Sequence, residues 1–154
     1  MRWTPAGKHV QRLTFTENAI ETSPTYNQTG SQIALISDRT GQTQLYIMDA
    51  DSANTRQLTF LNGMTDSPHW SPDGEWIAFV ARIDRTFDIF RVRPNGSDLA
   101  RLTADAGNYE NPHWAPDSRH LVYAKREDGS RRLFIMAADR SGKRQLTWSS
   151  RAIV

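Results

Sequence analysis

Two histidines spaced 44 residues apart are the side chains in this sequence best suited to do chemistry. His69 and His113 each follow a proline and precede a tryptophan, and Thr25 stands at the corresponding place after an earlier proline. Imidazole nitrogens bind metal ions when neutral and anions when protonated. An ion held by these side chains is one interpretation, and common ancestry of a repeated segment is the simpler one. We therefore predict no metal ligand and no cofactor.

The other reactive groups that enzymes use lack their usual context. The sequence has no cysteine, which excludes disulfides, thiolate catalysis and cysteine-based zinc sites. It also has no Gly-x-Ser-x-Gly, phosphate-binding loop or His-Glu-x-x-His motif. Residues 49–54 (Asp-Ala-Asp-Ser-Ala-Asn) lack the glycine and the terminal glutamate of a calcium loop, so they predict a turn. We expect no catalytic residues and no enzyme activity.

Composition predicts a single soluble domain with a real core. The chain has 154 residues, of which 38% are hydrophobic and 10% aromatic. Its 19 basic residues are scattered among 17 acidic ones, so we expect no nucleic-acid partner. Residues 1–10 do not resemble a signal peptide and no apolar run has membrane-spanning length, so we expect no membrane partner either. If the chain is complete, this favours the cytoplasm.

The elements that position these side chains repeat every 44 residues. Pro24, Pro68 and Pro112 mark the repeat, and a Leu-Thr pair follows each proline thirty-four residues later. An aromatic residue stands two positions after each proline: Tyr26, Trp70 and Trp114. A repeat of this length indicates a propeller, a solenoid or an array.

Each repeat predicts a four-stranded antiparallel sheet, so the fold class is all-β. Continuous apolar runs at 33–36, 77–80 and 121–124, with matching runs about twelve residues later, predict middle strands covered on both faces. The proline-bearing segment before them and the short polar segment after them predict the two edges. Such sheets, stacked radially, are the blades of a β-propeller, with the proline-bearing strands innermost. Thr25, His69 and His113 would then line the channel, and Trp70 and Trp114 would pack between blades. A helical repeat array is the alternative, but the Pro, Asp-Gly and Asn-Gly breaks exclude helices of the required length.

The repeat motif resembles a known family. Residues 67–74 (Ser-Pro-His-Trp-Ser-Pro-Asp-Gly), followed by Leu102-Thr103, are similar to the WD40-like (PD40) repeat of TolB-type six-bladed propellers. Related blades occur in prolyl-oligopeptidase-like peptidases. Residues 111–118 keep the motif, whereas residues 23–30 lack its Pro-Asp pair. This resemblance implies a blade type and not a function.

The repeat predicts the internal boundaries of one half-propeller domain. Residues 1–15 are expected to end with the outer strand of a preceding blade, because residues 7–14 match the end of a repeat. Residues 16–60, 61–104 and 105–148 are the three expected blades, and residues 149–154 a tail. The chain thus has four outer strands for three blades.

Three blades leave two apolar sheet faces bare, and symmetric closure is the simple remedy. We expect a homodimer with six blades in total; a nine-bladed trimer and a fragment of a longer propeller are the alternatives. Either outer segment, 11–14 of one copy or 144–147 of the other, is able to close the ring, so the surplus strand could exchange between copies.

The loops that lead from an outer strand to the next inner strand should gather at one mouth of the channel. These are residues 15–22, 60–66 and 104–110, and the loops between second and third strands share that face. TolB-like propellers bind partner proteins at this mouth, so the resemblance implies a protein or peptide site. The candidate residues are Asn62, Met64, Asp66, Asn108, Tyr109 and Glu110. Simple solvated loops are the alternative.

Three functions remain open. The first is a self-assembling, non-catalytic scaffold or protein-binding module, or a repeat fragment or engineered chain without a selected activity. The second is the propeller part of a prolyl-oligopeptidase-like peptidase. The third is a periplasmic TolB-type partner-binding protein. We favour the first, because neither the hydrolase domain nor the upstream α/β domain that the others require is visible in the sequence.

Overall fold

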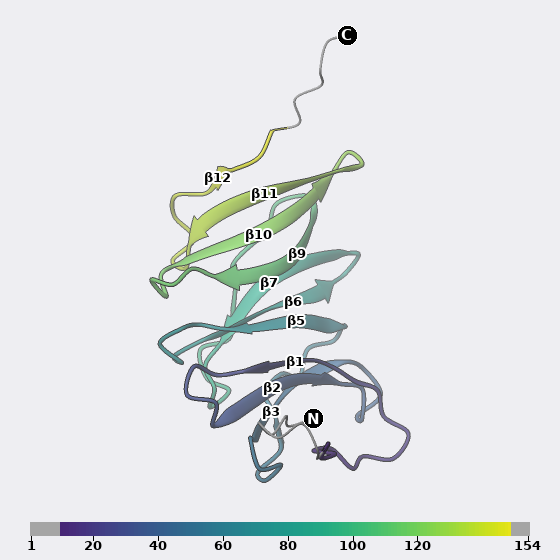
Figure 1. The fold of residues 1–154 in the computed structure, drawn as a ribbon. Helices are drawn as coiled ribbons and strands as arrows, with labels where there is room; N and C mark the ends of the chain where they lie inside the picture. The colour runs from purple at the N-terminus through teal and green to yellow at the C-terminus, as the bar shows by residue number, and fades with distance from the viewer. Residues whose placement is uncertain (1–9, 149–154) are drawn as a thin grey trace.

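Three four-stranded antiparallel sheets make up the computed structural model, which describes residues 10–148. They stack one above another in chain order, so that the middle sheet contacts both others (Figure 1). Blade 1 contains β1 (Glu21–Tyr26), β2 (Gln32–Ser37), β3 (Gln44–Asp49) and β4 (Arg56–Gln57). Blade 2 contains β5 (Thr65–Trp70), β6 (Ile77–Ile83), β7 (Thr86–Val92) and β8 (Ala100–Arg101). Blade 3 contains β9 (Asn108–Trp114), β10 (His120–Glu127), β11 (Ser130–Ala137) and β12 (Arg144–Gln145).

Each blade is a simple meander in which consecutive strands are neighbours. This arrangement confirms the predicted all-β class with propeller-type blades. Each sheet falls inside one of the three expected blade ranges. Residues 1–9 and 149–154, which hold the beginning of the expected outer segment and the expected tail, lie outside the described residues. No helix in the described part of the chain is long and apolar enough to cross a bilayer.

The innermost strand of every blade carries a bulge just before its proline. The register of β1, β5 and β9 shifts there against the next strand. Ser23, Ser67 and Asn111 adopt positive φ angles of 52°, 54° and 50° at this point. Proline cannot donate to the ladder, and a bulge absorbs that loss while turning the following side chain. The bulge therefore sets the direction of the residues after the proline, His69 and His113 among them.

Two clusters of buried side chains join the blades. Trp70 packs in the cluster between blades 1 and 2 together with Ile36, Leu58 and Phe79. Trp114 packs in the cluster between blades 2 and 3 with Leu102 and Tyr123. The expected packing of both tryptophans between blades is thus confirmed. A third cluster lies on the far face of blade 1, where Leu13 covers Ile33, Leu35, Tyr46 and Met48.

Blade 3 departs from the expectation that the middle strands are covered on both faces. β2 and β6 are buried along most of their length, whereas buried and half-buried positions alternate in β10 and most of β11 is half-buried or exposed. Leu133 is 43% exposed, whereas Ile89 at the same place in blade 2 is fully buried. The apolar sequence is the same in kind, but no neighbouring blade covers this face of blade 3 among the described residues.

Candidate functional site

The two repeated histidines, His69 and His113, lie together across the seam between blades 2 and 3. The ring centroids of His69 and His113 are 4.3 Å apart, and the rings are inclined at 50°. The backbone N–H of Trp114 donates to Nδ1 of His69 at 3.1 Å. Burial and, second, the proximity of His113 lower the pKa of His69. These features favour the neutral form of His69, and the hydrogen bond to its Nδ1 atom links blade 2 to blade 3.

Thr25 occupies the corresponding register position of β1. It lies opposite Ala34, as His69 lies opposite Ala78 and His113 opposite Val122. No group of three or more histidine, aspartate or glutamate side chains suited to a metal ion occurs within residues 10–148.

The mouth loops form three grooves that contain the candidate binding residues. The first groove, of about 640 Å³, lies between blades 1 and 2, and Asn62 and Met64 line it. The second, of about 340 Å³, lies between blades 2 and 3 and includes Asn108 and Glu110. The third, of about 270 Å³, adjoins the second and includes Asp66, Tyr109 and Glu110. The first two grooves are repeat equivalents, because Asp38, Thr43 and Arg82 of the first correspond to Arg82, Phe87 and Arg126 of the second.

A glycine shapes the loop between β4 and β5, which lines the first groove. A Cβ atom at Gly63 would lie 2.0 Å from the carbonyl oxygen of Arg82. The loop therefore approaches β6 more closely than any other residue type allows. This contact fixes Asn62 and Met64 over the edge of blade 2.

The six candidate residues differ in how far they reach the surface. Asn62, Met64 and Asp66 are exposed, and Asn108 and Glu110 are half-buried. The Oδ1 atom of Asn108 accepts the backbone N–H of Phe87 at 3.1 Å, and its NH2 group is a further donor on a residue that lines the second groove. Tyr109 is fully buried, so it supports the mouth without presenting a surface of its own.

The two equivalent grooves differ in charge. Asp38, Asp84 and Arg82 line the first groove. Three arginines, Arg82, Arg85 and Arg126, line the second together with Glu110. Within residues 10–148 none of these arginines forms an ion pair, whereas Glu110 pairs with Arg131 at 3.1 Å. The second groove therefore presents a positive surface around the half-buried ring of Phe87.

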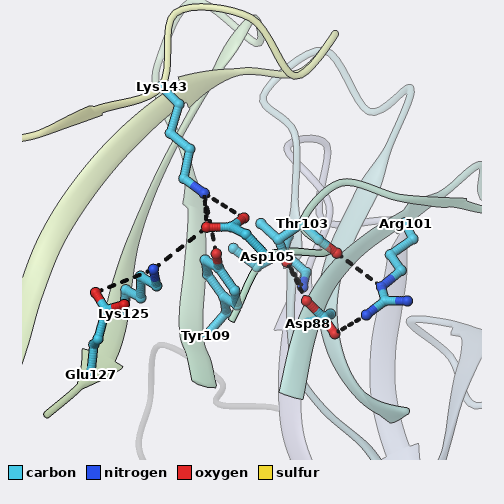
Figure 2. A network of polar contacts seen from close by, with 9 residues as sticks. Asp88, Arg101, Thr103, Asp105, Tyr109, Lys125, Glu127 and Lys143 are labelled. Carbon is cyan, nitrogen blue, oxygen red and sulfur yellow. Dashed lines mark hydrogen bonds and ion pairs between the residues drawn. The ribbon is translucent and has the colours of Figure 1, made fainter. Parts of the chain in front are cut away.

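A polar network next to the second groove anchors the loop between β8 and β9 (Figure 2). Lys143 donates to both carboxylate oxygens of Asp105, at 2.7 and 2.8 Å, and to the hydroxyl of Tyr109 at 3.1 Å. Burial raises the pKa of Asp105, but hydrogen bonds from Lys143 and Tyr109 and the charge of Lys143 outweigh it and lower that pKa. Burial, and then the hydrogen bond to Asp105, raises the pKa of Tyr109. The network explains why Tyr109 faces inward.

A second polar group in the same view ties the outer strand of blade 2 to its third strand. Asp88 is almost fully buried and accepts hydrogen bonds from Arg101 at 2.6 Å and Thr103 at 2.9 Å. Gln44 takes the place of Asp88 in blade 1, where it accepts from Thr59 at 2.8 Å. Because the same hydrogen bond recurs in two blades, we infer that it stabilises the blade and has no part in binding.

Three exposed aromatic side chains that follow the outer segments were not among the predicted residues. Phe15, Phe60 and Trp148 directly follow the Leu-Thr pairs and are 71%, 80% and 74% exposed. Their signal in the sequence is the recurrence of an aromatic residue at one repeat position, with Ala104 as the exception. Exposed aromatic residues of this size are common in protein interfaces.

Comparison with known proteins supports the architecture. The family model described as the TolB beta propeller domain (PD40) matches residues 4–153. A putative TolB from Agrobacterium tumefaciens is 26% identical with a TM-score of 0.76, over 86% of this chain and 50% of that one. TolB from Acinetobacter baumannii is 22% identical with a TM-score of 0.77, over 94% of this chain and 36% of that one.

Dipeptidyl peptidase 4 from Porphyromonas gingivalis shares the fold alone. It is 11% identical with a TM-score of 0.67, over 81% of this chain and 18% of that one. The chain thus spans half or less of the length of each of these three structures.

Proposed function

Because the chain belongs to the family of TolB β-propeller domains (PD40), as its repeat motif indicated, we propose that it is a non-catalytic protein-binding module. It binds a protein or peptide at the channel mouth, and the 154-residue chain completes a six-bladed ring with a second copy. The TolB-like propeller domain itself supports a protein-binding role.

The observation that carries the binding proposal is the pair of repeat-equivalent grooves. They lie at successive seams between blades; unpaired arginines line the second, and exposed Phe60 precedes Asn62 of the first by two residues. Aromatic and arginine side chains contribute most often to the energy of protein interfaces. Arg85 and Arg126 around the ring of Phe87 suit a segment in which a carboxylate stands beside an apolar side chain.

The strongly shifted ionisable groups support a non-catalytic role. Perturbed pKa values often mark active sites. Here the largest shifts belong to Asp105 and Tyr109, whose polar groups are occupied by each other and by Lys143. These groups hold a loop in place.

Exposed apolar side chains on the outer faces of blades 1 and 3 support association with a second copy, although Leu13 already covers the apolar residues of β2 and β3 on blade 1. Tyr26 of blade 1 is 45% exposed, whereas Trp70 and Trp114 at the same place in blades 2 and 3 are 5% and 6% exposed. Leu133 of blade 3 is exposed where its equivalent in blade 2 is buried. A second copy would cover both faces. At the internal seams, the face equivalent to that of blade 3 packs against the face equivalent to that of blade 1, so the same packing is available between two copies.

Native mass spectrometry tests the ring. We expect a species of twice 17.5 kDa. A stable, soluble monomer would contradict the dimer and favour a chain that belongs in a longer propeller. A mass of three chains would indicate the nine-bladed ring.

Selection of peptides from a displayed random library tests the mouth. We expect enriched peptides to contain an acidic residue next to an apolar one. Replacement of Arg85 by Glu should weaken their binding about tenfold or more, because it reverses a charge in the second groove. Replacement of Arg119 by Glu, in the turn between β9 and β10 at the opposite end of the blade, is the matched control. Binding that ignores Arg85→Glu would contradict the site.

A further inference from the structure

We propose that the ring closes by strand exchange: residues 11–14 of one copy form the outer strand of blade 3 in the partner copy and replace residues 144–147 there. This inference rests on the proposed association of two copies.

Residues 12–14 already have the local geometry of an outer strand. In each of the four outer segments, a side chain folds back onto the carbonyl oxygen of the threonine two residues later. These bonds are Arg12 to Thr14 at 2.5 Å, Gln57 to Thr59 at 2.6 Å, Arg101 to Thr103 at 2.9 Å and Gln145 to Thr147 at 2.5 Å. The segment before blade 1 is thus a fourth copy of the outer strand, in structure as well as in sequence.

Leu13 occupies the place that an outer strand takes on the next blade. Leu58, which follows β4, packs against blade 2, and Leu102, which follows β8, packs against blade 3. Leu13 packs in the same way on the far face of blade 1 and is 6% exposed, like Leu102. Residues 11–14 therefore sit beside blade 1 as the end of a preceding blade would, although the described residues contain no such blade.

Leu146 is the outer-strand leucine that lacks this environment. It is only partly buried, and the following Thr147 is exposed, whereas Thr59 and Thr103 are buried. If blade 3 of a partner packed onto blade 1 as blade 1 packs onto blade 2, its Leu146 would need the place that Leu13 already fills. Close-packed interiors do not hold two leucines in one position. Exchange removes the conflict, because Leu13 stays where it is and residues 11–14 gain the edge of the partner's β11.

Charges at the two bare ends match across the same seam. Between blades 1 and 2, the backbone N–H of Thr65 donates to the carbonyl oxygen of Thr43 at 3.0 Å. The repeat places Glu21 at the position of Thr65, and Arg131 at the position of Thr43, with Arg132 next to it. Opposite charges therefore meet where the two copies close. Each already has a partner within its own chain, Glu21 with Arg39 and Arg131 with Glu110, so the pairing sets register more than affinity.

Engineered cysteines test the exchange directly, since the chain has none of its own. Arg144 lies opposite Ile135 in the β11–β12 pair, and Gln11 is the repeat equivalent of Arg144. Opposed residues of antiparallel strands have Cα atoms about 4.5–5.5 Å apart, within the range of a disulfide. We expect the double variant Gln11→Cys, Ile135→Cys to give a covalent dimer on mild oxidation. The matched control, Ile135→Cys with Arg144→Cys, should keep both thiols free, because exchange separates them.

The opposite pattern would overturn the exchange. A disulfide within one chain in the control variant and none in the first variant, with a dimer still present by native mass spectrometry, means that the faces close without exchange. That result leaves the proposed ring intact. A monomer in native mass spectrometry contradicts both proposals.

A second pair of variants gives an equilibrium readout. We expect Leu13→Ser to raise the dimer dissociation constant about tenfold or more, since a buried apolar side chain at the closing seam is lost. Leu146→Ser should change it less than about threefold, since the displaced strand no longer contributes. Equal effects of the two substitutions would contradict the exchange.

Discussion

The hydroxyl of Thr103 donates a 2.9 Å hydrogen bond to the buried carboxylate of Asp88, and the backbone N–H of Ile89 donates to the same hydroxyl at 2.9 Å. Thr103 thereby links the end of the outer strand to β7 through side chain and backbone together. Blade 1 has the same link, from Thr59 to Gln44 and from Leu45 to Thr59. The repeated Leu-Thr pair thus has two functions: leucine fills the space between blades, and threonine fastens the strand that carries it.

Replacement of Asp88 tests this link. Asp88→Ala should lower the free energy of unfolding by about 2–4 kcal/mol, because Arg101 and Thr103 lose their buried partner. Asp88→Gln should cost less than half as much, because Gln44 fills this place in blade 1. Urea denaturation followed by tryptophan fluorescence measures both. Equal losses would mean that the charge of Asp88, and not its hydrogen bonding, stabilises the blade.

The half-buried position of His69 between blades 2 and 3 should make the stability of the fold depend on pH. Burial and the neighbouring His113 lower the pKa of His69 in the folded chain. Between its ordinary pKa near 6.5 and the lower folded value, the unfolded chain binds the extra proton. The free energy of unfolding should therefore fall as the pH drops below about 6.5 and level off below the folded pKa. His69→Asn, which keeps an acceptor for the Trp114 N–H, should remove this part of the dependence.

Thermal unfolding from pH 7 to pH 4.5 measures the histidine effect. The other histidines are present in both proteins, so the difference between the two curves isolates His69. His69→Leu is the second variant; it removes the acceptor and should cost about 1 kcal/mol even at pH 7.5. Parallel curves for the parent and His69→Asn would show that the imidazole does not titrate differently on folding.

Asp105 should affect the stability of the fold at a lower pH than His69 does. Despite the opposing effect of burial, Lys143 and Tyr109 lower the pKa of Asp105. Its contribution to stability is thus complete above the ordinary pKa near 4 and is lost as the pH falls toward the folded value. Asp105→Asn should be less stable than the parent at pH 7 and should lose less stability between pH 5 and pH 2. Asp105 is 54% exposed, so we expect the difference to be modest.

A double-mutant cycle with Lys143→Met controls for other carboxylates. One of these is Asp117, because hydrogen bonds from the backbone and from a side chain lower its pKa to about 2. The two substitutions should be strongly non-additive at pH 7 and less so at pH 2, because the charge of Asp105 is lost only as the pH falls toward its lowered pKa. Additivity at both pH values would contradict a direct coupling of Asp105 and Lys143.

The repeat made most of this fold predictable. The proline, the aromatic residue after it and the Leu-Thr pair each recur at a fixed spacing and each has a definite structural role, so the strands and the inter-blade packing followed from the sequence. The inward position of Tyr109 did not follow, because its environment comes from Asp105 and from Lys143, which lies 34 residues after Tyr109 in the turn between β11 and β12. The exposure of one face of blade 3 could not be predicted for a related reason. An apolar strand has the same kind of sequence whether its neighbouring blade is present or not, so Leu133 and Ile89 give the same prediction although only Ile89 is buried.

Tyr123 offers a substitution that should stabilise the chain. Its hydroxyl is buried and finds no hydrogen-bond partner among the described residues, and burial followed by the charge of Asp105 raises its pKa to about 12. Phe79 holds the same place in blade 2 and stacks on Phe90, as Tyr123 stacks on Phe134. Tyr123→Phe should therefore raise the free energy of unfolding by up to about 1 kcal/mol, equally at pH 6 and pH 9. A loss of more than about 1 kcal/mol in urea denaturation would show that the hydroxyl is satisfied in solution.

The exposed aromatic residue Phe60 should matter for binding and not for folding. Phe60 is 80% exposed, so Phe60→Ser should change the free energy of unfolding by less than about 0.5 kcal/mol. If Phe60 contacts the bound partner, the same substitution should weaken the binding of peptides selected against the parent chain by about tenfold or more. Leu99→Ser, at the exposed turn between β7 and β8 on the opposite end of the blade, is the matched control. Fluorescence anisotropy of labelled peptides measures all three proteins, and equal affinities would exclude Phe60 from the binding surface.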